Sequence, residues 1–388
     1  MIGILSTSSF GNSTFWIWIF WGSGAVIAYT YFGYGGWLWL RGRWRRKEVV
    51  RGPYSPFVSV VMVIQNEERV LERKLENLLT LDYPAELTQL VVVSDGSTDR
   101  TEAILHEYAS NPRVNVLLNQ LSRGKASGIN DALELAQGDV VVFTDARQRI
   151  EPSALRQLLE NFSDPEVGCA SGELMLGDLK TGEPGEGLGL YWKIEKRIRE
   201  LESASGSVVG ATGAFYAIRR DLFTPLPPGT ILDDVYLPMQ VARQEFRIVF
   251  DPRARAWDSA DRGTGREFAR KVRTLSGNYQ LLQLAPWLLT SANPIRFEFV
   301  SHKLLRLAAP FVLASLLVAS LALDAPVYRL ALALQAGFYG SSLLAIARLK
   351  TGPVARLADA ALTFVVLNTA AVVAFGNFVS GRKAAWIR

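Results

Sequence analysis

Four aspartates carry the chemistry that this 388-residue sequence offers most directly. Asp95 and Asp145 each end a short apolar run, whereas Asp233 and Asp234 stand side by side after a proline-rich turn. Carboxylates in such places bind a divalent cation, hydrogen-bond a nucleotide or take a proton from a hydroxyl group. Each also has an ordinary explanation, because aspartate is common in turns and at helix starts. Two aspartates at the tips of two strands of one sheet make coincidence the weaker explanation.

The composition narrows the metal chemistry. The chain has one cysteine, Cys169, and two histidines, His106 and His302. These residues exclude a disulfide framework within the chain and argue against a thiolate or histidine-rich zinc site. A metal should therefore be held by carboxylates, which suit Mg²⁺ or Mn²⁺, and Asp145 is the candidate ligand.

The elements that must position these aspartates alternate in type between residues 53 and 286. Short runs rich in Val, Leu and Ile have apolar residues at consecutive positions, which is typical of parallel strands covered on both faces. The predicted strands are 58–64, 90–93, 114–118 and 140–143, and predicted helices between them include 67–79 and 98–108. This alternation predicts a doubly wound α/β sheet whose site lies beyond the carboxyl ends of the strands.

An apolar segment precedes this region. Residues 1–40 contain no charged residue, and 15–40 are long and apolar enough for a transmembrane helix. A cleaved signal peptide would need a basic start and a shorter apolar core, which the segment lacks. The basic cluster directly after the segment is Arg41, Arg43, Arg45, Arg46, Lys47 and Arg51. Positive residues beside a membrane helix predict a cytoplasmic location for the domain that the cluster leads into. The positive charge of the chain, +5 in total, is concentrated beside the apolar segments, which argues against nucleic-acid binding.

Hydrophobic segments return at 304–323, 327–346 and 357–379. Three crossings would place the basic tail, with Arg382, Lys383 and Arg388, outside the cell, against the charge rule. The last segment is therefore also open to a re-entrant or interfacial interpretation. We expect three parts: a transmembrane and juxtamembrane part (1–52), a cytosolic domain (53–286, with an interfacial helix at 267–290) and a C-terminal membrane region (291–388) with two to three transmembrane or re-entrant helices.

Taken together, the motifs resemble a known family. They stand in the order Asp95-Gly96, Arg123-Gly124-Lys125 leading to Asn130, Thr144-Asp145-Ala146, and Asp233-Asp234. This order is similar to that of the inverting family 2 glycosyltransferases with a GT-A (Rossmann-like) fold. The membrane synthases of hyaluronan, cellulose, chitin and poly-N-acetylglucosamine are most similar in layout.

The resemblance implies roles for individual residues. Asp234 corresponds to the catalytic base with Asp233 beside it, Asp145 to the first metal-binding aspartate, and Arg273 to a clamp on the diphosphate. The residues implied in nucleotide binding are Asn66, Glu67, Asp95, Gly96, Lys125, Asn130, Arg147 and Arg270. The residues implied beneath the acceptor are Gly210, Thr212 and Gly213, in a glycine-rich stretch expected to be a strand.

Three positions depart from the family pattern, and one of them is Gln65, which replaces the usual aromatic residue before Asn66. Arg147 stands where a second metal-binding aspartate is expected, so metal binding should be weaker or the guanidinium should neutralise part of the phosphate charge. Thr274 follows Arg273 where processive synthases have tryptophan, which puts repeated transfer in doubt.

The resemblance implies an enzyme that transfers a sugar, with UDP as the favoured nucleotide, to a glycan or lipid-linked acceptor in polysaccharide biosynthesis. Its expected partners are the nucleotide sugar, the acceptor and membrane lipids, and a second copy or an export partner stays open. The expected location is the bacterial inner membrane, with the catalytic domain in the cytoplasm. The alternatives are a non-catalytic scaffold subunit, which the altered motifs favour, and a sugar nucleotidyltransferase, which would need a glycine-rich basic loop after its first strand.

Overall fold

Apolar runs form one half of the central sheet in the computed structural model, which describes residues 7–178, 183–184, 190–258, 264–346 and 352–382. The strands of this half are β1 (Val58–Ile64), β2 (Thr88–Asp95), β3 (Val114–Asn119) and β4 (Val140–Thr144). They pair in parallel in the order β3-β2-β1-β4. Every residue of β1, β2 and β4 is buried, as expected for strands covered on both faces. The four predicted strands are therefore confirmed.

The other half of the sheet differs from a doubly wound arrangement. Its strands are β5 (Arg149–Ile150), β6 (Val167–Asp178), β7 (Glu183–Pro184), β8 (Phe215–Arg219) and β9 (Arg247–Asp258). β8 runs antiparallel to both β4 and β6, whereas β6 and β9 are parallel. The direction reverses because the chain enters β8 at the edge where β4 ends, with Thr144 opposite Phe215. The sheet is therefore mixed, and its parallel half alone follows the predicted pattern.

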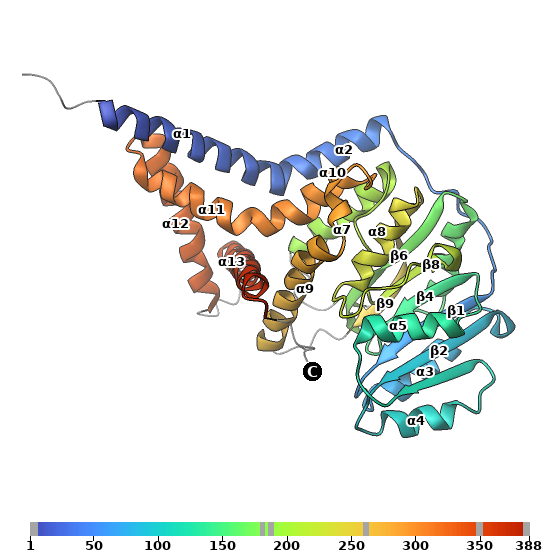
Figure 1. Ribbon diagram of the computed structural model, residues 1–388. Coiled ribbons are helices and arrows are strands. Elements are labelled where there is room, and N and C mark those ends of the chain that lie inside the picture. The colour runs from blue at the N-terminus through green and yellow to red at the C-terminus, as the bar shows by residue number, and fades with distance from the viewer. Residues whose placement is uncertain (1–6, 179–182, 185–189, 259–263, 347–351, 383–388) are drawn as a thin grey trace, which may run out of the picture.

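Helices cover the two faces of this sheet (Figure 1). They are α3 (Leu71–Leu79), α4 (Thr101–Tyr108), α5 (Lys125–Leu135), α6 (Ala154–Leu159) and α8 (Asp233–Arg243). α5 packs on β1 and β2, and α6 packs on β9. The buried side of α3 has helical spacing, with Leu71, Leu75 and Leu78, but its fourth buried member is Lys74. That lysine points toward the end of β4 and belongs to the site described below.

Long helices lie to one side of the α/β domain (Figure 1). α1 (Thr7–Ala28) continues through a π-helical turn (Tyr29–Gly33) into α2 (Tyr34–Trp44). The later long helices are α7 (Leu190–Ser205), α9 (Thr264–Leu284), α11 (Leu305–Ala322), α12 (Pro326–Ile346) and α13 (Pro353–Val379). The short helix α10 (Arg296–Phe299) and a π-helical turn (Val300–Leu304) lead directly into α11. α11 packs along α1, and α13 packs against α9 and α12.

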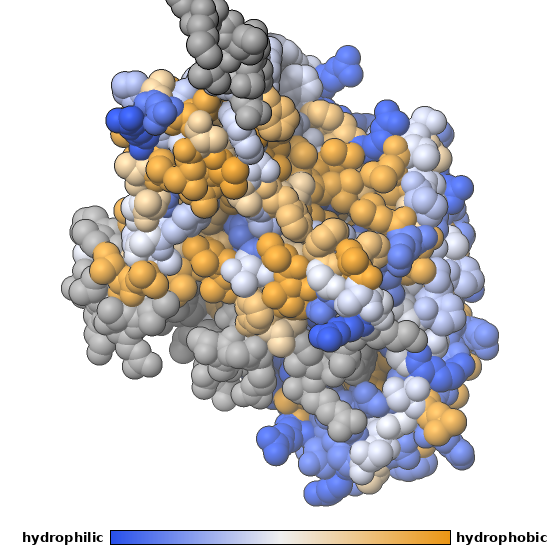
Figure 2. Space-filling view, turned by 60° about the vertical axis from the view of Figure 1, so that its left-hand side comes forward, coloured by the Kyte–Doolittle hydropathy of each residue, from blue (hydrophilic) through white to orange (hydrophobic). Residues whose placement is uncertain are grey.

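Three of these helices are long and apolar enough to cross a membrane. Within the described residues they span Ser13–Trp44, Arg296–Ala322 and Leu357–Val379. Large apolar side chains such as Trp18 and Leu334 are exposed on these long helices and on α12. Figure 2 shows hydrophobic surface gathered over this part of the molecule and hydrophilic surface over the far end of the α/β domain. α12 matches the predicted segment 327–346 but is not among the three. The tail residues Lys383 and Arg388 lie outside the described residues.

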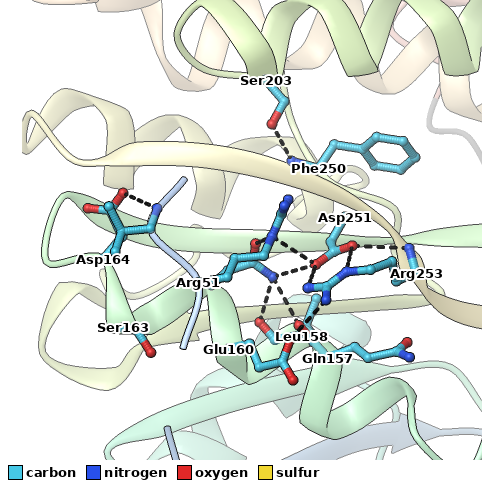
Figure 3. Close-up of polar contacts among 12 residues, drawn as sticks. Arg51, Gln157, Leu158, Glu160, Ser163, Asp164, Ser203, Phe250, Asp251 and Arg253 are labelled. Carbon is cyan, nitrogen blue, oxygen red and sulfur yellow. Dashed lines mark hydrogen bonds and ion pairs between the residues drawn. The ribbon is translucent and has the colours of Figure 1, made fainter. Parts of the chain in front are cut away.

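The segment between α2 and β1 is tied to the α/β domain by arginines. The buried Arg247 donates from Nη2 to the carbonyl oxygens of Lys47 (2.9 Å) and Ser203 (3.2 Å). Arg51 lies beside the fully buried Asp251, whose Oδ2 also accepts from Asn161 at 2.8 Å (Figure 3). These contacts fix the first long helix relative to the central sheet.

Candidate active site

The ends of β4 and α5 and the start of α8 bring three predicted site residues together. Lys125 extends its Nζ to Asp145 Oδ1 at 3.0 Å and to Asp233 Oδ1 at 3.3 Å. Burial alone would lower the pKa of Lys125, but the carboxylates of Asp145 and Asp233 outweigh it and raise that pKa above its ordinary value. Lys125 is therefore a permanent cation that holds two carboxylates at the centre of the cleft.

Asp234 is held by the backbone of the preceding loop. Its Oδ2 accepts a hydrogen bond from the Gly213 amide at 3.0 Å, and its own carbonyl oxygen accepts one from the Ala211 amide at 2.7 Å. Burial and the adjacent Asp233 raise the pKa of Asp234 to about 6, although Lys125 and Lys303 act in the opposite direction. A carboxylate with this pKa is ionised at neutral pH and accepts a proton more readily than an ordinary aspartate.

Asp233 faces the sheet, in contrast to its neighbour. Its side chain is buried, and its Oδ2 lies 3.3 Å from the Tyr216 hydroxyl group, which donates to it. The ring of Tyr216 stacks on Phe143 with centroids 4.7 Å apart. Asp233 thus fixes the start of α8 through Tyr216 and Lys125 and leaves Asp234 to face the cleft.

The glycine-rich stretch forms a loop, so the expectation of a strand there was wrong. Gly210 has a φ of +83°, which interrupts an extended strand, and β8 begins only at Phe215. A Cβ on Gly213 would lie 3.2 Å from Asp234 Oδ2, so the loop can approach the aspartate closely only with glycine there. The Thr212 amide donates to Ser171 Oγ at 3.0 Å, which ties the loop to β6.

Asp95 holds a loop on one side of the cleft. This side consists of the loops after β1, β2 and β4 and the start of α5, and it is called the donor side because the sugar donor is expected there. Its carboxylate is fully buried and accepts from the amides of Arg123 and Gly124, both at 2.8 Å, and from Ser122 Oγ at 2.8 Å. A Cβ on the neighbouring Gly96 would lie 2.5 Å from the Ser122 backbone nitrogen. These contacts position the segment that leads to Lys125, and a direct contact of Asp95 with a nucleotide base stays a prediction.

The two asparagines also hold loops. Asn66, at a φ of +54°, accepts on its Oδ1 from the Thr98 amide at 2.7 Å. Asn130 makes a pair of hydrogen bonds with the backbone of Leu226, at 2.9 Å and 2.8 Å. The amide of Asn130 is therefore engaged by the loop before α8, away from the carboxylate cluster.

Two arginines, Arg147 and Arg270, lie at the rim of the donor side. Arg147 forms an ion pair with Glu67, with Nη2 and Oε1 3.1 Å apart. Arg270 and Arg273 lie on α9, and burial together with the charge of Arg147 lowers the pKa of Arg270. Arg147 and Arg270 are thus close enough to repel each other, and an anion between them would relieve that repulsion.

The protein offers few ligands for a divalent cation at this site. Within the described residues, no group of three or more His, Cys, Asp or Glu side chains could hold a metal ion. The Asp145 side chain is 42% exposed, so it can offer an oxygen to the cleft. Nucleotide enzymes commonly hold Mg²⁺ with one or two carboxylates plus substrate phosphates. The residues therefore fit a metal that Asp145 shares with a diphosphate.

Lys74 is a further buried residue near Asp145, and the sequence did not predict its place there. Its buried Nζ donates to Thr144 Oγ1 at 2.8 Å and to the Gln148 carbonyl oxygen at 2.7 Å. Burial lowers the pKa of Lys74 to about 7, against the attraction of Asp145. The available signal was a lysine within the apolar stripe of α3.

Comparisons with known proteins find similarity in both sequence and fold. A family model described as "Glycosyl transferase family 2" matches residues 59–225. A poly-beta-1,6-N-acetyl-D-glucosamine synthase from Staphylococcus epidermidis is 23% identical over 241 residues, which cover 59% of this chain and 56% of the synthase. The synthase of the same name from Staphylococcus aureus (strain COL) is 24% identical over 236 residues, covering 58% and 55%. The chain thus spans little more than half the length of these curated relatives.

Among solved structures, the mannosyltransferase PcManGT from Pyrobaculum calidifontis has a similar fold. It was solved in complex with GDP-Man and Mn²⁺. The TM-score is 0.72 at 22% identity, with 93% of this chain and 98% of that chain covered, so the likeness extends beyond the α/β domain to the long helices. Residues 59–225 are thus similar to the family 2 glycosyltransferases, and the chain shares the GT-A-like fold of PcManGT.

Proposed function

We propose that the chain transfers a sugar from a nucleotide sugar to a hydroxyl group of a glycan or lipid-linked acceptor, with inversion at the anomeric carbon. The observation that carries the proposal is the Asp234 carboxylate, whose pKa of about 6 suits a general base and which stands beside the pair of Lys125 and Asp145. A single displacement requires a carboxylate that takes the proton of the acceptor hydroxyl group. It also requires charged groups that stabilise the leaving diphosphate.

In the proposed step, the acceptor oxygen forms a bond to the anomeric carbon while the bond from that carbon to the diphosphate breaks. The electron pair of the broken bond stays on the diphosphate, and the hydroxyl proton moves to Asp234. Lys125 holds positive charge where the diphosphate leaves, and Arg147 and Arg270 add charge at the rim. A bound divalent cation would supply further neutralisation of the diphosphate, with Asp145 as its protein ligand.

The donor and the location complete the proposal. A UDP sugar is the favoured donor, and GDP sugars are the alternative because the structural neighbour PcManGT was solved with GDP-Man. The basic cluster after α2 supports a cytoplasmic catalytic domain at the inner membrane of a bacterium. The product belongs to polysaccharide biosynthesis, as the names of the synthases suggest for those relatives.

The test is nucleotide release by the purified full-length protein in detergent. UDP and GDP sugars are supplied one at a time, with Mg²⁺, with Mn²⁺ or with a chelator, and with and without short glycan acceptors. Turnover of one donor that needs the metal and is lost in Asp234→Asn supports the proposal. Silence with every donor, although the nucleotide still binds, would favour a scaffold subunit, for which the replacement of a metal-binding aspartate by Arg147 is the supporting observation.

A further inference from the structure

Two cations stand close to Asp234 on the side of the cleft that faces the long helices. Arg199 lies on α7, and Lys303 lies in the π-helical turn Val300–Leu304 at the start of a candidate membrane span. The proposed transfer step uses neither residue. Short π-helical segments are uncommon and are often found at functional sites.

Arg199 belongs to the same wall of the cleft as Asp234. Its Nη2 donates to Ser171 Oγ at 2.7 Å, and its guanidinium lies 4.5 Å from the centre of the Phe250 ring. Ser171 Oγ also accepts from the Thr212 amide, and the next residue, Gly213, donates to Asp234. Burial lowers the pKa of Arg199, against the attraction of Glu195, Glu202 and Asp234.

The carboxylates of α7 near Lys303 already have cationic partners. His302 Nδ1 is 2.8 Å from Glu202 Oε1, and His302 Nε2 is 3.0 Å from Glu195 Oε1. Arg306 Nη1 donates to Glu195 Oε2 at 2.5 Å, and the Tyr34 hydroxyl group donates to Glu202 Oε1 at 2.6 Å. This network fixes the π-helical turn against α7, and Glu195, whose two oxygens contact His302 and Arg306, attracts Lys303 from a longer distance.

Arg199 and Lys303 therefore differ from their neighbours His302 and Arg306, which form direct ion pairs. Within the part of the chain that the structure describes, no carboxylate lies within 4.0 Å of the charged nitrogens of Arg199 or Lys303. Over a longer distance Glu195 attracts both cations most strongly, and Asp234 attracts both as well. Two cations in a partly buried place are costly unless an anion joins them, so the arrangement suits a ligand with two negative charges.

We propose that Arg199 and Lys303 bind a phosphate group of a lipid-linked acceptor and so place a hydroxyl group of that acceptor at Asp234. The proposal rests on the proposed function and names its acceptor class. A lipid is favoured over a soluble phosphate because Lys303 begins the span Arg296–Ala322, where headgroups meet the protein. Arginine offers a bidentate contact to phosphate, and lysine adds a point charge.

The test measures binding and needs no turnover. Full-length protein in a neutral detergent is titrated calorimetrically with dodecyl phosphate, with dodecyl glucoside and with inorganic phosphate. Lys303→Met and Arg199→Met should each weaken dodecyl phosphate binding by about tenfold or more, because each removes one charged hydrogen bond. Arg197→Met, on the exposed side of α7, and Arg329→Met, at the start of α12, are matched controls that should leave binding unchanged.

Asp234→Asn separates this proposal from the transferase proposal. It should abolish transfer but tighten dodecyl phosphate binding by about threefold, because it removes the negative charge beside the two cations. Binding that is equal for dodecyl phosphate and inorganic phosphate would overturn the lipid assignment. Binding that Lys303→Met and Arg199→Met leave unchanged, or that falls equally in the two controls, would overturn the phosphate site. Lys303→Met keeps the test decisive if Arg199→Met fails to fold.

Discussion

The donor side and the acceptor side of the cleft are built in different ways. The donor side consists of the loops after β1, β2 and β4 and the start of α5, and its polar groups bond one another, as Asp95 does with residues 122–124. The acceptor side consists of residues 207–214, α7 and the π-helical turn Val300–Leu304, and its contacts join distant segments, such as Tyr34 with Glu202. The α/β domain therefore forms most of the donor side, to which α9 adds Arg270, whereas the acceptor side depends on the docked long helices.

Asp234→Asn should have the largest effect, since Asp234 lies where the two sides meet. We expect transfer to fall by about a thousandfold with little change in donor binding, because the amide cannot accept the hydroxyl proton. Rates of product formation and a donor titration would measure both. Asp221→Asn, at an exposed position, is the matched control. A variant that keeps more than a tenth of the rate would remove Asp234 from the role of base.

Lys125→Met tests the donor side. We expect about a hundredfold slower nucleotide release, because Asp145 and Asp233 lose the cation between them and the diphosphate loses its nearest positive charge. Steady-state kinetics with varied donor would show it. If Lys125→Met weakened only acceptor use, the division into two sides would be incorrect.

Glu202→Gln tests the acceptor side. The buried carboxylate joins Tyr34 of α2 and His302, so its loss should destabilise the docked helices by about 2 kcal/mol and lower acceptor use more than donor binding. Limited proteolysis reports the docking, and a donor titration reports the other side. Glu200→Gln, on the exposed pair with Arg197, serves as control and should change neither.

Arg147→Asp should sharpen the metal chemistry of the donor side. A second carboxylate after Asp145 should tighten Mn²⁺ binding by about tenfold, because hard cations gain from each added oxygen ligand. Arg147→Gln separates the loss of the guanidinium from the gain of the carboxylate. A metal titration of nucleotide release would distinguish the variants, and equal metal affinity in both would argue against a site at Asp145.

The pH dependence should be the mildest effect. The folded-state pKa of Asp234 is raised, to about 6, so its carboxylate is protonated as pH falls through that value. The rate at limiting substrate should be level above pH about 7, halved near pH 6 and about tenfold lower for each further unit. A rate that does not fall between pH about 7 and pH about 5 would contradict the assignment of Asp234 as base, because the pKa of about 6 lies within that range.

Much of the donor side could be predicted from the sequence. β1, β2 and β4 are buried on both faces, so their apolar runs appear directly in the sequence, and parallel strands place their carboxyl ends together. Asp145 and Lys125 lie as close as that argument requires. Asp95 and Asn130 lie near the cleft, but their hydrogen bonds to the backbone could not be read from residue type.

The acceptor side was harder to predict for physical reasons. The family resemblance implied a strand in the glycine-rich stretch 210–215, whereas the positive φ of Gly210 and the contact of Ala211 with Asp234 give a loop up to residue 214. Lys303 follows Arg199 by more than a hundred positions in the sequence, and no local pattern relates them. Their proximity arises only when the π-helical turn docks on α7.

The stereochemistry of the product tests the central claim most directly. Once the donor panel has named a sugar, the purified protein is given the α-linked nucleotide sugar, and the anomeric configuration of the product is read by proton NMR before any other enzyme acts. A single displacement with Asp234 as base predicts a β-linked product. An α-linked product would require a second displacement or a different mechanism, and would contradict the account.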